Sequence, residues 1–443
     1  MTIPTHDLTT DAGRAAFDAL LEALRLDPVQ LATGGGEAEA AVRKTLEDVA
    51  GRGDDALVEA ARRFDDPDFT EDDIVVSPAE MAEAHARIDA DLLRALRVAI
   101  GQVRAYQQHI LPPEVPDFER EGGGVKLGLR WTSLDSAGCY FPGGKASYPS
   151  SLIHLAVPAQ VAGVGQVVGC TPPSKYGKSD LVLAACHELQ LDACVRAGGA
   201  AAVAALAFGT ERVPRVDKIV GPGNTYVQVA KRLLAGGVGI DGYLGPSEVL
   251  VIADETADPS LVAADLMAQA EHDPGSCFLL TDSADLAANV TAEIDRQIVD
   301  LSRRPAIEKA LAERSCLAVG ASIETLLPLA DALACEHVNV QTVDPRATLA
   351  KLRHAGCVFL GRCSPVAAGD YVAGPSHCLP TNTTARFSGG ISVYEFLKRT
   401  GTVEYAPAGI AADATSVIPL ARTEGLDAHA ASVRQRVAAD AAT

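Results

Sequence analysis

The sequence predicts an α/β protein with two doubly wound, incomplete Rossmann-like parallel sheets and small helical segments at its N- and C-terminal ends. From about Gly128 onward, short apolar runs alternate with helical patterns of ten or more residues, which is typical of βαβ units. There are roughly eight such runs over roughly 230 residues, which favours two sheets over one. Helical periodicity before residue 110 and after Gly390 flanks this region.

The first hundred residues are expected to be helical. Amphipathic patterns cover Gly13–Leu26, Glu37–Val49 and Asp55–Phe64. The run Ser77-Pro78-Ala79-Glu80 is a capping box with proline at the first helical position, and it predicts a long helix towards Ile110. The prolines that follow Leu111 end that helix.

The later elements follow from the apolar runs. The expected strands are Ala137–Phe141, Val167–Thr171, Lys218–Val220, Val249–Ile252, Cys277–Leu280, Cys316–Val319, Val338–Gln341 and Val358–Leu360. Helices are expected at Val393–Arg399, Ala406–Thr423 and Leu426–Ala439. The expected division is a helical segment 1–35, one α/β domain from 36–139 plus 249–390, an inserted α/β domain 140–248, and a helical tail 391–443.

Charge and composition exclude several classes of protein. The 443 residues carry 38 Lys and Arg against 58 Asp and Glu, a formal charge of −20, so a nucleic acid or an anionic membrane is not an expected partner. Neither a signal peptide nor a run of about 18 apolar residues is present in the sequence, so a cytoplasmic protein is expected. The ten cysteines include no CxxC pair and are expected to be reduced thiols, most of them buried.

One glycine pattern is rejected as a dinucleotide signature. The run Gly237-Val-Gly239-Ile-Asp-Gly242 matches G-x-G-x-x-G, but that signature needs a strand before it and a helix after it. Here a helical pattern precedes the glycines and a strand pattern follows them.

Two other glycine loops have the required context. Pro142-Gly143-Gly144 follows one expected strand, and Gly221-Pro222-Gly223-Asn224 follows another; each loop leads into a helix. Backbone N–H groups at such a turn can hold an anion such as a pyrophosphate. The alternative for each is a tight βα turn in which glycine supplies a positive φ.

Metal-type residues gather at several places in the sequence. Gln269 and His272 are three apart at the end of a helix and share a face. Further candidates are Glu336-His337, Asp370, His377, Glu424 and His429. A Gln, His, Asp and His set suits a borderline divalent ion, but Glu271 is an equally good ligand by type, so spacing alone leaves the ligand set open.

Longer motifs carry a resemblance. In order they are Cys139-Tyr-Phe-Pro-Gly-Gly-Lys145, Tyr148-Pro-Ser-Ser151, Val220-Gly-Pro-Gly-Asn224, Gly245-Pro-Ser-Glu-Val-Leu-Val-Ile-Ala-Asp254, Gln269-Ala-Glu-His272, Glu336-His337, Ala368-Gly-Asp-Tyr371, Gly374-Pro-Ser-His377 and Glu424-Gly-Leu-Asp-Ala-His429. Over essentially its whole length the chain resembles the histidinol dehydrogenase family.

The resemblance implies a homodimeric enzyme that uses zinc, one ion per subunit, and NAD to oxidise L-histidinol to L-histidine through the aldehyde. It implies that Gln269, His272, Asp370 and His429 hold zinc and that the C-terminal segment with Glu424 and His429 crosses to the other subunit. Zinc would fix the imidazole and the amine of the substrate, so its part is orientation. The domain of 36–139 plus 249–390 would then carry most of the metal and catalytic residues, and the inserted domain would contact the cofactor.

The resemblance also implies a role for each remaining candidate. His337 would remove the hydroxyl proton, a task suited to a pKa near neutrality. Glu336 would activate the water that hydrates the aldehyde. Substrate contacts would come from the zinc ligands, from His337 and from Ser247, His377 and Glu424. Tyr140 and Asn224 would touch the cofactor.

Departures from the family pattern leave two alternatives open. Ala201 stands where the family commonly has a glutamine that reaches the cofactor, and Cys335 stands where proline usually precedes the Glu-His pair. The run Asp241 to Leu244 also differs. The alternatives are a dehydrogenase of another zinc-chelating alcohol on the same scaffold and a non-catalytic relative that binds metal or nucleotide. All the expected ligands and bases are present, which disfavours the second; an unrelated α/β binding protein does not explain so many motifs.

Overall fold

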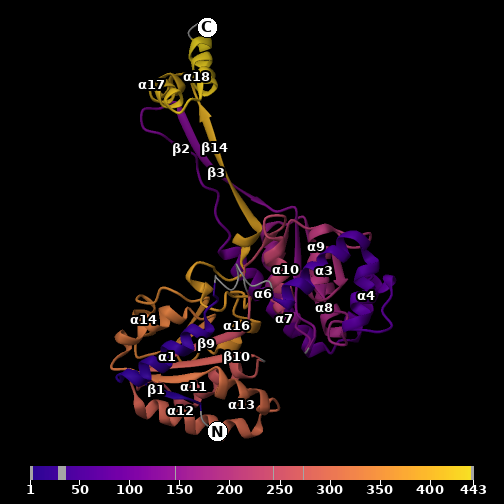
Figure 1. Cartoon of the computed structure of the whole chain (residues 1–443), viewed down its shortest axis with the longest axis vertical. Coiled ribbons are helices and arrows are strands. Elements are labelled where there is room, and N and C mark those ends of the chain that lie inside the picture. Colours follow the sequence, from indigo (N-terminus) through magenta and orange to yellow (C-terminus); the bar gives the residue numbers. More distant parts are fainter. Residues whose placement is uncertain (1–2, 28–35, 145, 243, 273, 441–443) are drawn as a thin grey trace. The chain divides into compact units, whose positions relative to one another are not determined.

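The computed structural model of the chain describes residues 3–27, 36–144, 146–242, 244–272 and 274–440 (Figure 1). It consists of two compact units. The larger unit comprises Met1–Ile110 and Asp135–Phe396, and the smaller comprises Leu111–Leu134 and Leu397–Thr443. Over the residues that the structure describes, no helix is both long and apolar enough to cross a membrane.

The larger unit contains a six-stranded parallel sheet in the order β1-β11-β10-β9-β12-β13. Its strands are β1 (Thr5–Asp7), β9 (Ser247–Ala253), β10 (Gly275–Thr281), β11 (Cys316–Val319), β12 (His337–Gln341) and β13 (Cys357–Leu360). Its helices are α1 (Asp11–Leu24), α11 (Pro259–Ala270), α12 (Ala284–Gln297), α13 (Arg304–Glu313), α14 (Ile323–Leu333), α15 (Pro345–Leu349) and α16 (Val366–Tyr371). Short 3₁₀ turns lie at Ile298–Asp300, Thr384–Arg386 and Val393–Phe396.

Both faces of this sheet are buried, as the near-continuous apolar strands predict. Val249 and Val251 of β9 pack with α11, α12 and α13, while Leu250 and Ile252 pack with α1 and α14. Figure 1 shows these helices around the sheet. On β12, Val338 and Val340 pack on the α14 side. Since side chains alternate along a strand, the polar residues of β12 face α11.

A second, five-stranded parallel sheet has the order β6-β5-β4-β7-β8. Its strands are β4 (Ser136–Tyr140), β5 (Gln166–Thr171), β6 (Ala193–Arg196), β7 (Lys218–Val220) and β8 (Gly239–Ile240). Its helices are α3 (Glu37–Arg52), α4 (Asp54–Phe64), α5 (Pro78–Arg87), α6 (Ala90–His109), α7 (Pro149–Ala162), α8 (Asp180–Glu188), α9 (Gly199–Phe208) and α10 (Thr225–Leu234), with a 3₁₀ turn at Glu71–Asp73. One apolar cluster joins this sheet to α5–α8, and another joins it to α3, α4, α9 and α10. The expected fold class, two doubly wound parallel sheets, is confirmed.

The packing departs from the expected division in three places. Residues 36–110 pack on the five-stranded sheet rather than with 249–390, because the apolar faces of α3 to α6 find their partners there. The N-terminal segment is not only helical, since β1 extends the six-stranded sheet. Residues 28–35, also assigned to that segment, lie outside the described part.

Two helix predictions also differ. The expected long helix to Ile110 is two helices, α5 and α6, because the Asp89 side chain caps α6 by accepting hydrogen bonds from the N–H groups of Asp91 and Leu92. Val393–Arg399 is not a helix: Val393–Phe396 is a 3₁₀ turn, and a strand begins at Leu397. The G-x-G-x-x-G run at 237–242 follows helix α10, contains the short strand β8 and is followed by strand β9. This order differs from the strand, glycine loop and helix of a dinucleotide-binding motif.

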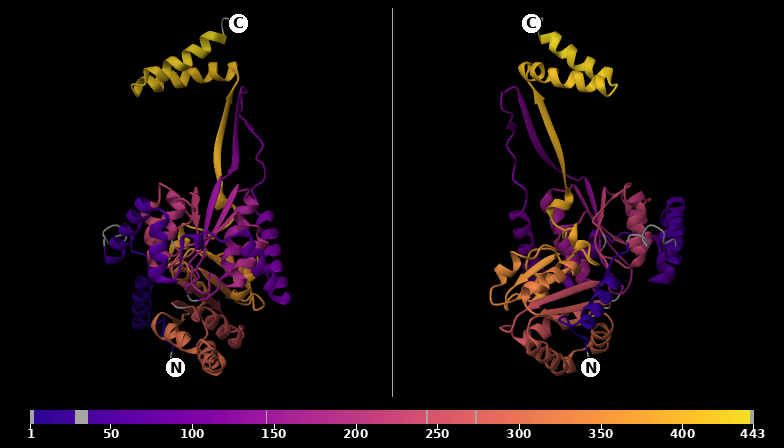
Figure 2. Two further views of the ribbon diagram at one scale, coloured as in Figure 1. Left: turned by 90° about the vertical axis from the view of Figure 1, so that its right-hand side faces the viewer. Right: turned by 60° about the vertical axis from the view of Figure 1, so that its left-hand side comes forward.

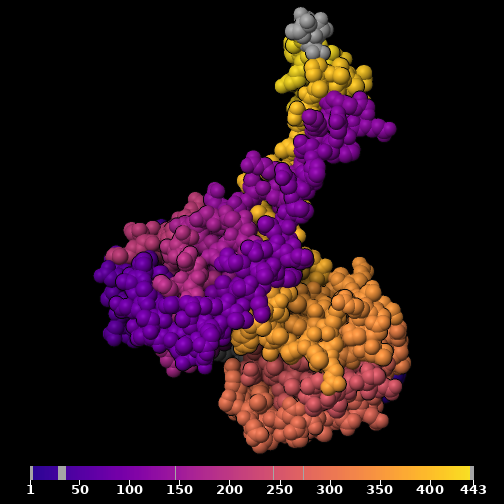
Figure 3. All heavy atoms as spheres, turned by 180° about the vertical axis from the view of Figure 1, so that it is seen from behind, coloured from indigo at the N-terminus to yellow at the C-terminus, as the bar shows by residue number. Residues whose placement is uncertain are grey.

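The smaller unit combines a three-stranded antiparallel sheet with two helices. Its elements are β2 (Phe118–Glu119), β3 (Val125–Ser133), β14 (Leu397–Tyr405), α17 (Pro407–Thr423) and α18 (Asp427–Asp440). β14 and β3 pair along their whole lengths, side by side in both views of Figure 2. Arg120 contacts Asp413 at 2.8 Å and ties the sheet to α17. In Figure 3 the atoms of α17 and α18 are yellow.

Candidate functional site

The candidate residues of the larger unit gather where strands of the six-stranded sheet begin. Ser247 and Glu248 open β9, His337 opens β12, and His272 lies just before β10. In a βαβ unit the helix returns the chain to the amino ends of the strands, so the ends of α11 and α16 reach this edge with Gln269, His272 and Asp370. The two glycine loops, by contrast, follow the carboxyl ends of β4 and β7.

The main chain of Glu248 holds both residues of the Glu336-His337 pair. Its N–H donates to Glu336 Oε2 at 2.9 Å, and its carbonyl oxygen lies 3.3 Å from His337 Nδ1. A carbonyl can only accept, so Nδ1 carries the proton in the neutral ring and Nε2 has the free lone pair. His337 Nε2 lies 3.8 Å from Asp370 Oδ1 and forms no hydrogen bond with any residue that the structure describes.

Burial governs the charge of this pair. His337 is 3% exposed, and burial lowers its pKa to about 3, not the neutral range that sequence reasoning expects for a base. The ring is therefore a neutral acceptor at physiological pH. Burial raises the pKa of Glu336 well above its ordinary value, and the neighbouring Glu248 carboxyl adds to the increase.

Glu248 is a buried carboxyl that the sequence does not single out. Burial raises its pKa to about 8, and the Asn382 N–H donates to Oε1 at 3.1 Å. The Ser247 hydroxyl, half-buried beside it, favours the ionised form of Glu336.

Three expected metal ligands lie in this region of the larger unit. Gln269 is 3% exposed, and its amide nitrogen has no hydrogen-bond partner in the described ranges. His272 and Asp370 interact electrostatically: burial lowers the pKa of His272 and raises that of Asp370 to about 6, and each group opposes the shift of the other. No three His, Cys, Asp or Glu side chains of the described residues converge as a complete metal site. By donor type, the amide oxygen of Gln269, the imidazole of His272 and the carboxylate of Asp370 would fit three of the four positions that a tetrahedral ion needs.

The remaining expected ligand belongs to the smaller unit. His429 lies on α18 and Glu424 directly follows α17, and both side chains are exposed there. Asp273, next to His272, lies outside the described residues.

His377 is tied to two elements of the larger unit. Its Nδ1 lies 2.8 Å from the Asp370 carbonyl, and its Nε2 lies 3.0 Å from the Ser151 hydroxyl of α7. The buried ring of His154 lies against it, with the ring centroids 4.6 Å apart and the ring planes tilted by 42°. The sequence does not single out His154, although it lies one helical turn after Ser151. A substrate contact through His377 Nε2 would replace the Ser151 bond.

The expected cofactor residues lie at the two glycine loops of the five-stranded sheet. Tyr140 ends β4, is 3% exposed, and its hydroxyl accepts from the Gly199 N–H at the start of α9 at 3.4 Å. Asn224 is exposed and caps α10 by accepting from the N–H groups of Tyr226 and Val227. Ala201, in the first turn of α9, is buried in the same apolar cluster as Tyr140.

A polar network centred on Asp265 links α11, β12 and the start of α16 behind the candidate site. Asp265, one helical turn before Gln269 on α11, accepts from Asn339 Nδ2 at 3.1 Å and from Gln341 Nε2 at 3.2 Å, and the Val366 N–H at the start of α16 also faces it. Asp265 therefore connects the three elements that carry Gln269, His337 and Asp370. Sequence reasoning missed it, since its partners lie 74 and 76 positions away.

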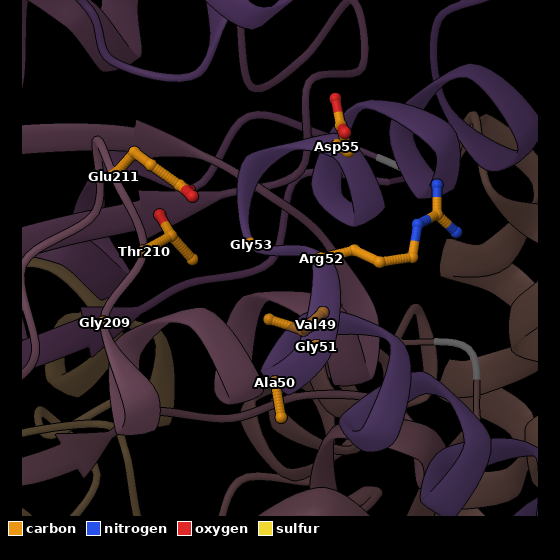
Figure 4. A pocket seen from close by; sticks show the side chains of 9 residues that line it. All are labelled: Val49, Ala50, Gly51, Arg52, Gly53, Asp55, Gly209, Thr210 and Glu211. Atoms are coloured by element: carbon orange, nitrogen blue, oxygen red, sulfur yellow. The ribbon is translucent and has the colours of Figure 1, made fainter.

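The hollow in Figure 4 is separate from these groups. It has a volume of about 660 Å³ and is lined by residues 49–53, Asp55 and residues 209–211, none of which is a candidate. There Glu211 accepts the Asp54 N–H at 3.0 Å and caps α4. Glu211 therefore has a structural role at the start of α4.

Comparisons with known proteins agree on one family. A family model described as histidinol dehydrogenase matches residues 32–437. Histidinol dehydrogenase of Thermosynechococcus vestitus is 44% identical over 90% of this chain and 93% of its own, and that of Bacillus subtilis is 44% identical over 89% and 92%. The crystal structure of histidinol dehydrogenase from Elizabethkingia anophelis superposes with a TM-score of 0.88 at 33% identity, covering 95% of this chain and 96% of that one.

Proposed function

This chain belongs to the histidinol dehydrogenase family, and we propose that it oxidises L-histidinol to L-histidine through L-histidinal, the last step of histidine biosynthesis. It is an oxidoreductase, so the proposal concerns its substrate, cofactors and residue roles. The observation that carries the proposal is the gathering of an unpartnered His337 Nε2, the Asp370 carboxylate, His272 and Gln269 at one edge of the six-stranded sheet.

We assign the zinc ligands as Gln269, His272 and Asp370, with His429 of a second copy as the fourth. The bound ion supplies an anchor for the imidazole nitrogen and the amine of the substrate. The electrostatic interaction of the buried His272 and Asp370 supports two of these positions, and Gln269, buried one helical turn before His272, would contribute its amide oxygen. Glu424, on the same segment of the second copy as His429, then accepts from the far N–H of the substrate imidazole. Ser247 and His377 line the rest of the substrate site.

NAD supplies the hydride acceptor for both oxidations. We assign the glycine loops at Tyr140 and Asn224 to its binding, because backbone N–H groups at such turns can hold a pyrophosphate. The exposed Asn224 and the uncapped start of α9 beside Tyr140 support this assignment. The buried methyl of Ala201 offers that site no hydrogen bond.

His337 accepts the hydroxyl proton as the carbinol carbon loses hydride. Its tautomer supports this role, since the Glu248 carbonyl fixes the proton on Nδ1 and leaves Nε2 as the acceptor. The aldehyde adds water, and Glu336 removes a proton from that water. The buried Glu336 carboxylate is a stronger base than an exposed one, because its pKa is raised. The hydrate then loses a second hydride and yields the carboxylate.

The test is the stoichiometry of NADH formation by zinc-loaded protein with L-histidinol. Two NADH per histidinol, lost after chelation and restored by zinc, is the expected result. His337→Asn should lower kcat by about 10²–10⁴ with zinc content unchanged, whereas the exposed His187→Asn should match the wild type. Activity only with other amino alcohols would transfer the proposal to another zinc-chelating substrate. Zinc-loaded, folded protein without any dehydrogenase activity would contradict it.

A further inference from the structure

The five-stranded part of the larger unit contains a fully buried ion pair. Lys231 lies on α10, Asp241 follows β8, and the ammonium and carboxylate groups are in contact. Their side chains are 1% and 0% exposed. Neither residue has a role in the steps assigned above.

Both partners of this pair also bind the backbone of one residue of the second glycine loop, Gly221. Lys231 Nζ donates to the Gly221 carbonyl oxygen at 3.0 Å. Asp241 Oδ2 accepts from the Gly221 N–H at 2.6 Å. The backbone of Gly221 is therefore held on both its donor and its acceptor by charged side chains, which form stronger hydrogen bonds than neutral ones.

Gly221 adopts a conformation that glycine alone tolerates at this position. Its φ is +119°, a value that L side chains rarely adopt, and a Cβ there would lie 1.8 Å from the Tyr140 carbonyl oxygen. The turn thus brings the end of β7 against Tyr140, the other residue assigned to the cofactor. Glycine also has the largest backbone freedom to lose, so the two bonds restrict Gly221 at the point where the loop leaves β7.

Other groups hold the neighbouring segment Leu244–Gly245, which leads to the expected substrate residue Ser247. Gln228, one turn before Lys231 on α10, binds Leu244 through its side-chain amide at 2.9 Å and 3.3 Å. The Thr381 hydroxyl accepts from the Gly245 N–H at 2.7 Å. Gln228 Nε2 also lies 3.4 Å from the Gly223 carbonyl oxygen of the glycine loop. Removing the ion pair therefore removes both bonds to Gly221, while the contacts to Gly223 and to the segment before Ser247 remain.

We propose that Lys231 and Asp241 are positioning residues that fix the Gly221 loop for the cofactor; this rests on the proposed function. Replacing a buried ion pair by apolar residues of similar volume often leaves stability unchanged, whereas removing one partner does not. The pair is accordingly retained for the orientation of Gly221 more than for stability.

The test uses zinc-loaded full-length protein and the double variant Lys231→Met with Asp241→Leu. Wild-type binding of NAD is measured first by calorimetry, and L-histidinol binding is measured in parallel. The double variant should raise the Kd and KM for NAD at least about tenfold, with the histidinol Kd and the zinc content close to wild type. Its unfolding midpoint should fall moderately, because the buried Gly221 N–H and carbonyl lose their partners. Arg97→Met with Glu188→Gln removes an ion pair on the far side of the same sheet, between α6 and α8, and serves as the control.

The alternatives give different results. An NAD Kd within about twofold of wild type in the folded double variant overturns the inference. Equal weakening of both ligands with lower stability also overturns it, because that is the result of a purely structural role. If the double variant does not fold, Lys231→Gln with Asp241→Asn decides: it removes both charges together, replaces the charged hydrogen bonds to Gly221 by weaker neutral ones, and should weaken NAD binding alone. Wild-type protein that oxidises histidinol without binding NAD overturns the cofactor assignment and this inference together.

Discussion

At the scale of single residues, the main chain of Glu248 does more than its sequence position indicates. The N–H and the carbonyl oxygen of this one residue contact Glu336 and His337, so His337 acquires its tautomer from a strand neighbour rather than from a side chain. Strand pairing of β9 with β12 places these backbone groups, because Val249 is in register with His337. Substitution of the Glu248 side chain therefore leaves these two backbone contacts in place.

The Glu248 side chain makes stability depend on pH. Its pKa is raised from 4.5 to about 8 by burial, so the folded protein keeps this proton over a range in which the unfolded chain has released it. Between these values the unfolded state binds fewer protons, and raising the pH favours unfolding by up to ~1.4 kcal/mol per pH unit. This stabilising contribution is complete below about pH 4.5 and is lost as the pH rises through about 8.

Glu248→Gln should remove this dependence. The difference in unfolding free energy between variant and wild type should shift in favour of the variant from pH 5.5 to pH 8.5. Urea unfolding of chelator-treated protein at these pH values measures it. Glu313→Gln at the exposed end of α13 should follow the wild type at every pH. A constant difference between Glu248→Gln and the wild type would contradict the prediction.

At the scale of elements, buried apolar content decided what could be predicted. β9 and β10 are apolar on both faces, and the sequence predicts them within two residues of their ends. β14 was missed because Lys398 to Tyr405 is polar and exposed, so neither a buried strand nor an alternating pattern is visible. The residues of its partner β3 are mostly half-buried or exposed to solvent. β1 and β6 were missed although β7 and β11 are as short and were predicted. β1 is polar throughout (Thr-His-Asp), and β6 offers only an Ala-Cys-Val run before its arginine.

The network around Asp265 is an element-scale feature that only the fold reveals. Asn339 and Gln341 point from β12 towards α11, where their amide groups meet the Asp265 carboxylate. Because α16 starts at the same carboxylate, the network sets the spacing of Gln269, His337 and Asp370. Outer contacts of this kind orient metal ligands.

Asp265→Asn should therefore loosen the metal site. The amide nitrogen it introduces would face the donors of Asn339 and Gln341, which costs about 1–3 kcal/mol of unfolding free energy. Zinc affinity should fall by about 10–100-fold. Urea unfolding and competition with a chromogenic chelator measure the two effects. Asp285→Asn in the exposed first turn of α12 is the matched control. Unchanged zinc affinity in a destabilised variant would separate Asp265 from the site.

At the scale of the whole molecule, the candidate site could be predicted only in part from the chain. Local spacing puts Gln269 and His272 on one helix face and Glu336 beside His337, which makes them candidates, but their selection as site residues rested on the resemblance to the family. Glu248 and Glu336 are 88 positions apart, and Lys231 meets Asp241 only because β8 pairs with β7. Such contacts depend on strand order, which periodicity does not contain.

The exposed position of His429 leads to a prediction about assembly. Its unit presents Glu424 and His429 to solvent beside the exposed Leu420 and Leu426, which are 63% and 41% accessible. Exposed apolar side chains around polar ligands are typical of a surface that a partner covers. If His429 completes the metal site of a second copy, then Asp370→Asn and His429→Asn each inactivate their own homodimer.

A heterodimer of the two variants, isolated with two different tags, distinguishes the arrangements. When ligands are shared, one of its sites has every ligand and the other lacks two, so it should regain about half of the wild-type activity. When every ligand comes from one chain, both chains are defective and the heterodimer is inactive. The control pairs a wild-type chain with a chain that carries both substitutions. For that heterodimer the outcomes reverse. When ligands are shared, each site lacks one ligand and the heterodimer is inactive. When every ligand comes from one chain, the site of the wild-type chain is intact and about half of the activity remains. The two heterodimers together therefore identify which copy supplies His429, and zinc content per dimer reports the same result without turnover.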